Sequence, residues 1–143
     1  MEWDNYFMEL CEVVASNSKC QSRKLGAIIT GDKVVVATGY NGPPREFPNP
    51  GHCPRKEFNS GERLDLCPAT HAEVNCVASA ARLGVSVKGA TLYLNWTIPC
   101  KNCLGVIINA GIEEIVVKKL EFYDQLAEEI VKHSSLIIRE AKI

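Results

Sequence analysis

The fold of this chain is decided by one stretch, residues 71–117, which reads HAEVNCVASAARLGVSVKGATLYLNWTIPCKNCLGVIINAGIEEIVV. Its apolar and small residues switch between helical spacing and strand spacing, and a glycine follows each helical run where a helix C-terminus favours one. Pro99 marks the start of the second helical run, because proline suits the first turn of a helix. We expect the order helix, strand, helix, strand, at residues 71–83, 90–96, 99–110 and 113–118.

The flanking segments extend this pattern in both directions. Before it, Asp4 is placed to cap a helix, and two β-branched runs flank Gly31-Asp32 as a hairpin turn. The hairpin strands must be antiparallel, whereas the later strands, joined by helical crossovers, should be parallel. The order predicts a single domain, residues 1–143, with a three-layer α/β fold: a mixed five-stranded sheet with helices on both faces. The added elements are a helix at 4–18, the hairpin at 24–40, a helix at 123–133 and a strand at 136–139.

A long segment, residues 41–69, interrupts the regular pattern. It holds most of the prolines and shows almost no periodicity, so we expect a loop. Loops of this length within compact domains are usually functional or disordered.

Composition limits the classes of function. The 143 residues suffice for one core, and no apolar run approaches the roughly 20 residues of a membrane span. The first residues, MEWDNYF, lack the pattern of a signal peptide, so we expect a cytoplasmic protein without a membrane partner. Seven cysteines in a reducing compartment favour metal ligands or catalysis over disulfides. A formal net charge of −1 disfavours a polynucleotide partner, which usually requires a basic excess.

Two short motifs carry the chemistry, HAE at residues 71–73 and PCKNC at residues 99–103. Both lie where a helix is expected to begin, so His71, Cys100 and Cys103 can converge where two helix N-termini meet. These N-termini lower thiol pKa values and favour thiolate ligands. Three nitrogen and sulfur ligands leave a tetrahedral zinc ion with one open position, the arrangement of a catalytic site. Glu73 is placed to shuttle protons beside a water molecule in that position.

The two motifs together form the signature of zinc-dependent nucleobase deaminases, His-x-Glu followed by Pro-Cys-x-x-Cys. A Cys-x-x-Cys motif alone would be weak evidence, since redox sites and structural zinc modules share it. The alternatives are a structural zinc site with a fourth ligand, or thiols that serve as core residues.

Beyond the motifs, most of the chain resembles the deoxycytidylate (dCMP) deaminase family. The resemblance rests on SKCQSRKLGAIITGDKVVVATGYNGPP at residues 18–44, on HAEVN, GVSVKGATLYL and PCKNC, and on IINAGIEEIVV at residues 107–117. It implies the cytidine-deaminase fold and a hydrolytic reaction that converts a deoxycytidine nucleotide to its uridine form. It also implies that His71, Cys100 and Cys103 bind the catalytic zinc, while Glu73 moves protons between water, the pyrimidine ring nitrogen and the leaving ammonia.

The resemblance implies further contacts with the nucleotide. The backbone N–H of Ala72 should help to hold the base, Asn41 should contact the sugar, and Tyr123 should close over the nucleotide, with simple packing as the alternative for Tyr123. Some of the basic residues in and around the loops should meet the phosphate: Arg23, Lys24, Arg45, Arg55, Lys56 and Arg63.

A second metal site is also implied, because some members of the family carry a structural zinc held from the corresponding segments. Its candidate ligands here are Cys20, His52, Cys53 and Cys67. A loop poor in core-forming residues gains most from such a metal. The alternative is that these thiols are free.

Three functions remain open at this point. The first is deamination of dCMP, with dCTP as an alternative or additional substrate. The second is deamination of a polynucleotide, such as adenosine in tRNA, and the third is a zinc-stabilised module without turnover, against which Glu73 argues. The resemblance further implies dCTP and dTTP as effectors and a homo-oligomer, either a dimer or a hexamer.

Overall fold

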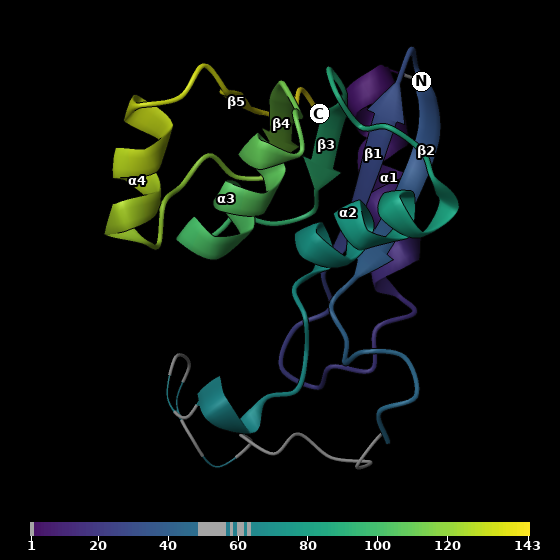
Figure 1. Cartoon of the computed structure of the whole chain (residues 1–143), viewed down its shortest axis with the longest axis vertical. Helices are drawn as coiled ribbons and strands as arrows, with labels where there is room; N and C mark the ends of the chain where they lie inside the picture. The colour runs from purple at the N-terminus through teal and green to yellow at the C-terminus, as the bar shows by residue number, and fades with distance from the viewer. Residues whose placement is uncertain (1, 49–56, 58, 60–61, 63) are drawn as a thin grey trace.

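The computed structural model describes residues 2–48, 57, 59, 62 and 64–143 of the chain (Figure 1). Helices and strands follow the order α-β-β-α-β-α-β-α-β that the sequence predicts, with one additional short 3-10 turn in the long loop. The elements are α1 (Trp3–Ala15), β1 (Gly26–Gly31), β2 (Val34–Tyr40), η1 (Leu64–Leu66), α2 (Ala72–Leu83), β3 (Thr91–Leu94), α3 (Lys101–Asn109), β4 (Glu114–Val117), α4 (Gln125–Lys132) and β5 (Ile137–Glu140).

The five strands form one mixed sheet in the order β2-β1-β3-β4-β5. Strand β1 runs antiparallel to both of its neighbours, β2 and β3. Strands β3, β4 and β5 are parallel to one another, as expected for strands joined by helical crossovers. The predicted mixed five-stranded sheet is therefore confirmed.

Side chains of the central strands alternate between two separate cores, one on each face of the sheet. Ile28, Tyr93 and Val116 point toward α1, where they pack with Phe7, Met8 and Cys11. Their neighbours along the strands face α2, α3 and α4 and belong to the larger core. In Figure 1 α1 lies behind the sheet while α2 and α3 lie in front of it. The predicted three layers, with helices on both faces, are confirmed.

The hairpin turn differs from the prediction by one residue. Gly31 pairs with Val34 inside the ladder, so the two turn residues are Asp32 and Lys33 rather than Gly31 and Asp32. Both have positive φ values, 54° and 64°. This left-handed geometry matches the twist of two-residue hairpins, and an aspartate adopts it more readily than most residues. The turn therefore forms at Asp32 and Lys33, although glycine is the residue that positive φ values usually favour.

The predicted capping role of Asp4 is wrong. Helix α1 begins at Trp3 and its N-cap is Glu2, whose side chain makes no capping hydrogen bond. The Asp4 side chain is instead buried and accepts two hydrogen bonds from Arg139 of β5, at 2.6 and 2.9 Å. The Asp4 carboxylate therefore forms a tertiary ion pair with Arg139 and does not cap α1.

Glycine 39 allows α2 to lie directly on the sheet. A Cβ atom at this position would collide with the backbone nitrogen of Cys76 and the backbone oxygen of Ala72, both in α2. The N-terminus of α2 is thereby held close to the end of β2. This close approach sets the position of the residues that begin α2.

The ends of the long loop are tied together immediately before α2. Gly42 and Thr70 form an isolated antiparallel bridge, with N···O distances of 3.1 and 2.8 Å. The loop thus leaves and returns at one point on the edge of the sheet. None of the helices within the described residues is both long enough and apolar enough to cross a membrane.

Candidate active site

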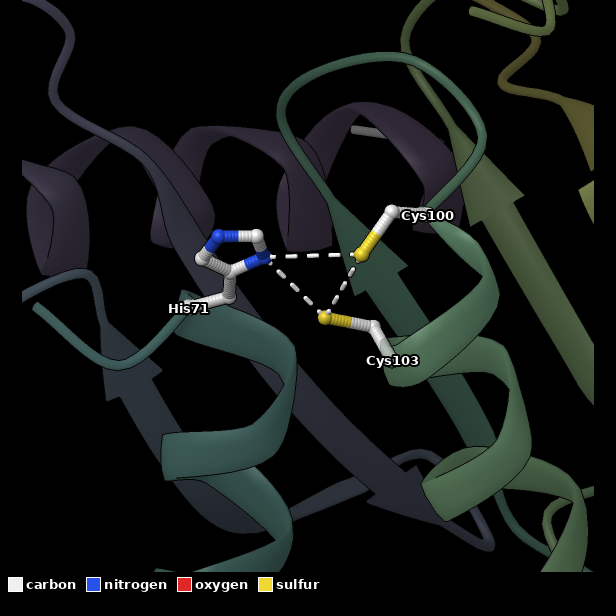
Figure 2. Close-up of side chains that lie close together, drawn as sticks. All are labelled: His71, Cys100 and Cys103. Carbon is white, nitrogen blue, oxygen red and sulfur yellow. Dashed lines mark hydrogen bonds between the residues drawn. The ribbon is translucent and has the colours of Figure 1, made fainter. Parts of the chain in front are cut away.

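Three potential metal ligands meet at the ends of α2 and α3, with their side chains directed toward one another (Figure 2). His71 Nδ1 lies 3.2 Å from Cys103 Sγ and 3.7 Å from Cys100 Sγ, and the two sulfur atoms are 3.6 Å apart. The described residues contain no other group of three such ligands this close together. The predicted convergence of these three residues at two helix starts is therefore what the structure shows.

Two of the ligands occupy the N-cap positions of their helices. His71 precedes α2 and Cys100 precedes α3, and neither side chain forms a capping hydrogen bond. Helix α3 starts at Lys101, two residues later than predicted, since Pro99 stays outside it. An N-cap residue has extended backbone geometry, so its side chain can point away from the helix it begins. This leaves both ligand atoms free to face a metal.

The distances fit a zinc ion. Tetrahedral coordination with ordinary zinc–sulfur and zinc–nitrogen bonds requires ligand atoms roughly 3.5–3.8 Å apart. The three observed separations lie at or slightly below this range. One nitrogen and two sulfur atoms are a donor set that zinc favours, and three protein ligands leave its fourth position open. The cluster can hold a zinc ion of the catalytic type.

The two cysteines ionise very differently in the absence of a metal charge. Hydrogen bonding from Cys103, aided by His71, lowers the pKa of Cys100 far below that of a free thiol. The hydrogen bond to Cys100, together with burial, raises the pKa of Cys103. The hydrogen bond to Cys100 also raises the pKa of His71. Cys103 therefore favours its protonated form when no metal is bound, and a bound cation would displace that proton because metal-bound thiols ionise.

Glu73 lies beside this cluster and is almost fully buried, at 3% exposure. Its Oε1 atom has no hydrogen-bond partner in the described structure. Burial raises the pKa of its carboxyl group, while His71 opposes this effect. A buried carboxylate oxygen without a partner is costly, so its presence here points to a ligand or a reacting molecule that completes it.

Asn41 lies at the same edge of the sheet, directly after β2. Its Oδ1 accepts from the Leu25 N–H at 2.9 Å, and its Nδ2 donates to the Arg23 carbonyl at 2.8 Å. The side chain therefore braces the segment before β1. The predicted contact between Asn41 and a sugar stays a prediction. The same is true of Ala72, the first residue of α2, whose backbone N–H has no partner within the helix at that position.

The sequence predicted that Tyr123 lies inside the helix at residues 123–133, but the structure places it before α4. The residue is 62% exposed. Burial, followed by the charges of Cys100 and Glu73, nevertheless raises the pKa of its phenol. Tyr123 thus borders the site with most of its ring accessible, which leaves its predicted closure over a nucleotide as a prediction.

Sequence reasoning missed two contributors to the site, Asn75 and Trp96. Asn75 Nδ2 donates to the carbonyls of Tyr40 and Thr70, at 2.8 and 3.1 Å, and so fastens the first turn of α2 to the ends of β2 and the long loop. The Arg23 guanidinium lies 4.0 Å above the Trp96 ring, at the edge where β3 ends. Asn75 could have been noticed because it is a polar residue within the HAEVN motif. No local sequence pattern indicates that Arg23 and Trp96 lie together.

The structure describes only two of the four candidate ligands of the second metal site. Cys20 and Cys67 are half-buried free thiols. His52 and Cys53 lie outside the described residues. The second zinc therefore stays a prediction.

Comparison with known proteins gives consistent matches. The family model of the cytidine and deoxycytidylate deaminase zinc-binding region matches residues 1–119. A deoxycytidylate deaminase from Saccharomyces cerevisiae is 37% identical over 140 residues, which cover 96% of this chain but 44% of that protein. A deoxycytidylate deaminase from Mycobacterium phage D29 is 35% identical over 127 residues, which cover 82% of this chain and 95% of the phage protein.

The fold matches a solved structure as well. A crystal structure of dCMP deaminase from cyanophage S-TIM5, in complex with dCMP and dUMP, superposes with a TM-score of 0.79 and 22% identity. The match covers 95% of this chain and 94% of the phage chain. At this identity the superposition shows a shared fold.

Proposed function

This chain belongs to the cytidine and deoxycytidylate deaminase zinc-binding family, and from that premise we propose that it hydrolyses dCMP to dUMP and ammonia. One observation carries the proposal: the unpaired, buried carboxylate oxygen of Glu73 lies beside a His/Cys/Cys cluster that can hold zinc. A purely structural zinc site has no use for such a carboxylate. The names of the S. cerevisiae and phage D29 relatives support dCMP as the substrate.

In this proposal His71, Cys100 and Cys103 hold the metal and Glu73 moves the protons. A zinc ion at such a site supplies the acidity that makes a water molecule nucleophilic near neutral pH. Glu73 takes a proton as the water oxygen attacks the amino-bearing ring carbon, and passes it to the neighbouring ring nitrogen. It then carries the second water proton to the amino group as the carbon–nitrogen bond breaks. Its raised pKa suits a group that alternately accepts and releases a proton.

The remaining site residues select the nucleotide. The Ala72 N–H holds the base, Asn41 contacts the sugar, and Tyr123 covers the ring. Arg23, stacked on Trp96 at the edge of the sheet that carries the metal site, offers a cation for the phosphate dianion. A single phosphate needs few such donors, whereas a polynucleotide needs a basic track, and the chain has 16 lysines and arginines against 17 acidic residues.

The test is ammonia release from dCMP, dCTP, cytidine, cytosine in single-stranded DNA, and adenosine in tRNA, measured with one enzyme preparation. We expect turnover of dCMP and little turnover of either polymer. Activity on dCTP that equals or exceeds activity on dCMP would identify a triphosphate or dual enzyme. Efficient deamination of a polymer, with dCMP inert at millimolar concentration, would overturn the proposal.

The second zinc belongs to the proposal as a structural site of Cys20, His52, Cys53 and Cys67. Elemental analysis of protein purified without chelator should then find more than one zinc per chain. A Cys67→Ala variant should lose the excess metal and keep the catalytic zinc. A metal content near one, unchanged in that variant, would mean that the loop thiols are free.

The proposal also includes a cytoplasmic location, dCTP and dTTP as effectors, and a homo-oligomer, either a dimer or a hexamer. Exposed apolar side chains on α1, among them Trp3, Tyr6 and Val13, offer a surface for assembly. Light scattering on the purified protein measures the assembly. Initial rates of dCMP deamination with added dCTP or dTTP measure the regulation by these effectors.

A further inference from the structure

One carboxylate joins the N-termini of α3 and α4. Asp124 is the N-cap of α4, and its Oδ1 accepts a hydrogen bond from the Leu126 N–H at 3.1 Å. Its second oxygen, Oδ2, accepts from the Lys101 N–H of α3 at 2.9 Å. The two bonds use different oxygens, so the same side chain caps its own helix and the first residue of a neighbouring one.

Helix α3 needs this external cap because its own N-cap residue is a metal ligand. The Cys100 side chain makes no capping hydrogen bond to α3, and its sulfur contacts the Cys103 sulfur instead. The N–H groups of the first turn have no partners within the helix, and an N-cap side chain would ordinarily accept from them. Asp124 accepts from the residue directly after Cys100. It thereby supplies part of the capping that Cys100 gives up when its sulfur faces the cluster.

The tie also determines where Tyr123 lies. Tyr123 is bonded directly to Asp124 in the chain, and the charges of Cys100 and Glu73 contribute to the raised pKa of its phenol. Tyr123 precedes α4 and so has no helical hydrogen bonds of its own to hold it. The Asp124–Lys101 bond connects the backbone beside Tyr123 to the backbone beside Cys100. Together with the hydrogen bond from the Ile98 N–H to the Glu121 carbonyl, this bond holds the backbone at Tyr123 close to the metal ligands.

We propose that Asp124 is a positioning residue that holds Tyr123 beside the metal site by fastening the start of α4 to the start of α3. This inference rests on the proposed function, in which Tyr123 covers the bound nucleotide. Asp124 itself need not touch the substrate. Loss of the tie should weaken substrate binding while it leaves the zinc ligands and Glu73 in place.

The decisive variant is Asp124→Asn. Asparagine is as good an N-cap as aspartate, so α4 keeps its start, but its single side-chain oxygen cannot also accept from Lys101. Glu128→Gln is the matched control, because it removes the same charge from an exposed position in the first turn of α4. Both variants should contain as much zinc as the wild type.

For Asp124→Asn we expect the KM for dCMP to rise roughly 2- to 10-fold, the equivalent of one net hydrogen bond, with kcat within about 2-fold of wild type. Glu128→Gln should leave both constants unchanged. In a Tyr123→Ala background, the same Asp124→Asn change should alter KM by less than about 2-fold, because the residue it positions is absent. A KM effect of undiminished size in that background, or equal behaviour of the two single variants, would overturn the inference.

A measurement without substrate separates this inference from the proposed function. In fluorine NMR of protein containing fluorotyrosine, the Tyr123 signal, identified with Tyr123→Phe, should shift or narrow in Asp124→Asn and stay unchanged in Glu128→Gln. If the wild type fails to turn over dCMP but the signal responds in this way, the proposed function fails and the positioning role stands. An unchanged signal refutes the positioning role whatever the enzyme's activity.

Discussion

The two faces of the sheet treat buried carboxylates in opposite ways. On the α1 face, Asp4 accepts two hydrogen bonds from Arg139, a third from the Lys142 N–H at 2.8 Å and a long fourth from the Tyr93 hydroxyl at 3.4 Å. On the opposite face Glu73 is also buried, yet its Oε1 has no partner in the described structure. Both are acidic residues in the first turn of a helix.

This contrast separates a structural role from a chemical one. Ion pairing lowers the pKa of Asp4, so the group stays charged and its pairing stabilises the fold. Burial raises the pKa of Glu73 and leaves it with unused hydrogen-bonding capacity. Such a group costs folding free energy and is available to a substrate. Acidic residues therefore stabilise one face through pairing and leave an unpaired buried oxygen on the other.

The largest effect should come from removal of a metal ligand. In Cys100→Ala the cluster keeps two ligands, so we expect the catalytic zinc and the deaminase activity to be lost together. Elemental analysis and ammonia release, measured on the same preparation, test this. Full activity in a variant that has lost its zinc would show that the metal site is not the catalytic one.

Replacement of Glu73 should separate activity from stability. We expect Glu73→Gln to bind zinc normally but to lose at least about 10²- to 10⁴-fold in kcat, because one group serves several proton transfers. Its free energy of unfolding should not fall, since a neutral amide is less costly to bury than an unpaired carboxylate. Activity above about a hundredth of the wild-type level would contradict the assigned role.

The corresponding change on the other face should have the reverse outcome. Asp4→Asn removes the charge that pairs with the Arg139 guanidinium, so we expect the free energy of unfolding to fall by about 2–3 kcal/mol with unchanged kcat. Glu12→Gln is the control on the same helix, because the exposed Glu12–Lys118 pair should contribute less than about 1 kcal/mol. Urea unfolding measures the free energy of unfolding of both variants. Equal decreases would show that the Asp4 network stabilises the fold no more than the exposed Glu12–Lys118 pair.

The smallest effect should appear in the pH dependence of that stability difference. Because Arg139 lowers the folded-state pKa of Asp4, the stabilisation is complete above the ordinary aspartate pKa of about 4 and is lost as the pH falls through the lower folded value. The difference between wild type and Asp4→Asn should therefore stay constant from pH 7 to about 5 and narrow below about 4. A difference that narrows as the pH rises would refute this assignment.

Most of the predicted site follows from local patterns. A histidine or a cysteine placed where a helix begins sits at a predictable end of that helix, and parallel strands joined by crossovers carry those ends to one edge of the sheet. This is why His71, Cys100 and Cys103 could be assigned together. Tyr123 followed from family resemblance, and its closure over a nucleotide stays a prediction.

The wrong prediction for Asp4 arose because its side chain had two possible partners. Asp4 could cap its own helix or pair with a distant cation, and the structure joins it to Arg139, 135 residues away in the chain. Asp124, in contrast, has both kinds of partner at once. It caps its own helix α4 and also accepts a hydrogen bond from the Lys101 N–H of α3. Sequence periodicity contains no information about such choices.

The sequence by itself determined the order of helices and strands, the two faces of the sheet and the three side chains that form the His/Cys/Cys cluster. These depend on spacing along the chain and on the chemistry of each side chain. Only the tertiary structure decided which carboxylate is satisfied and which is left open, and how Asp124 joins α3 to α4. Hydrogen bonds form between atoms that meet within about 3 Å, and that proximity exists only after the layers have packed.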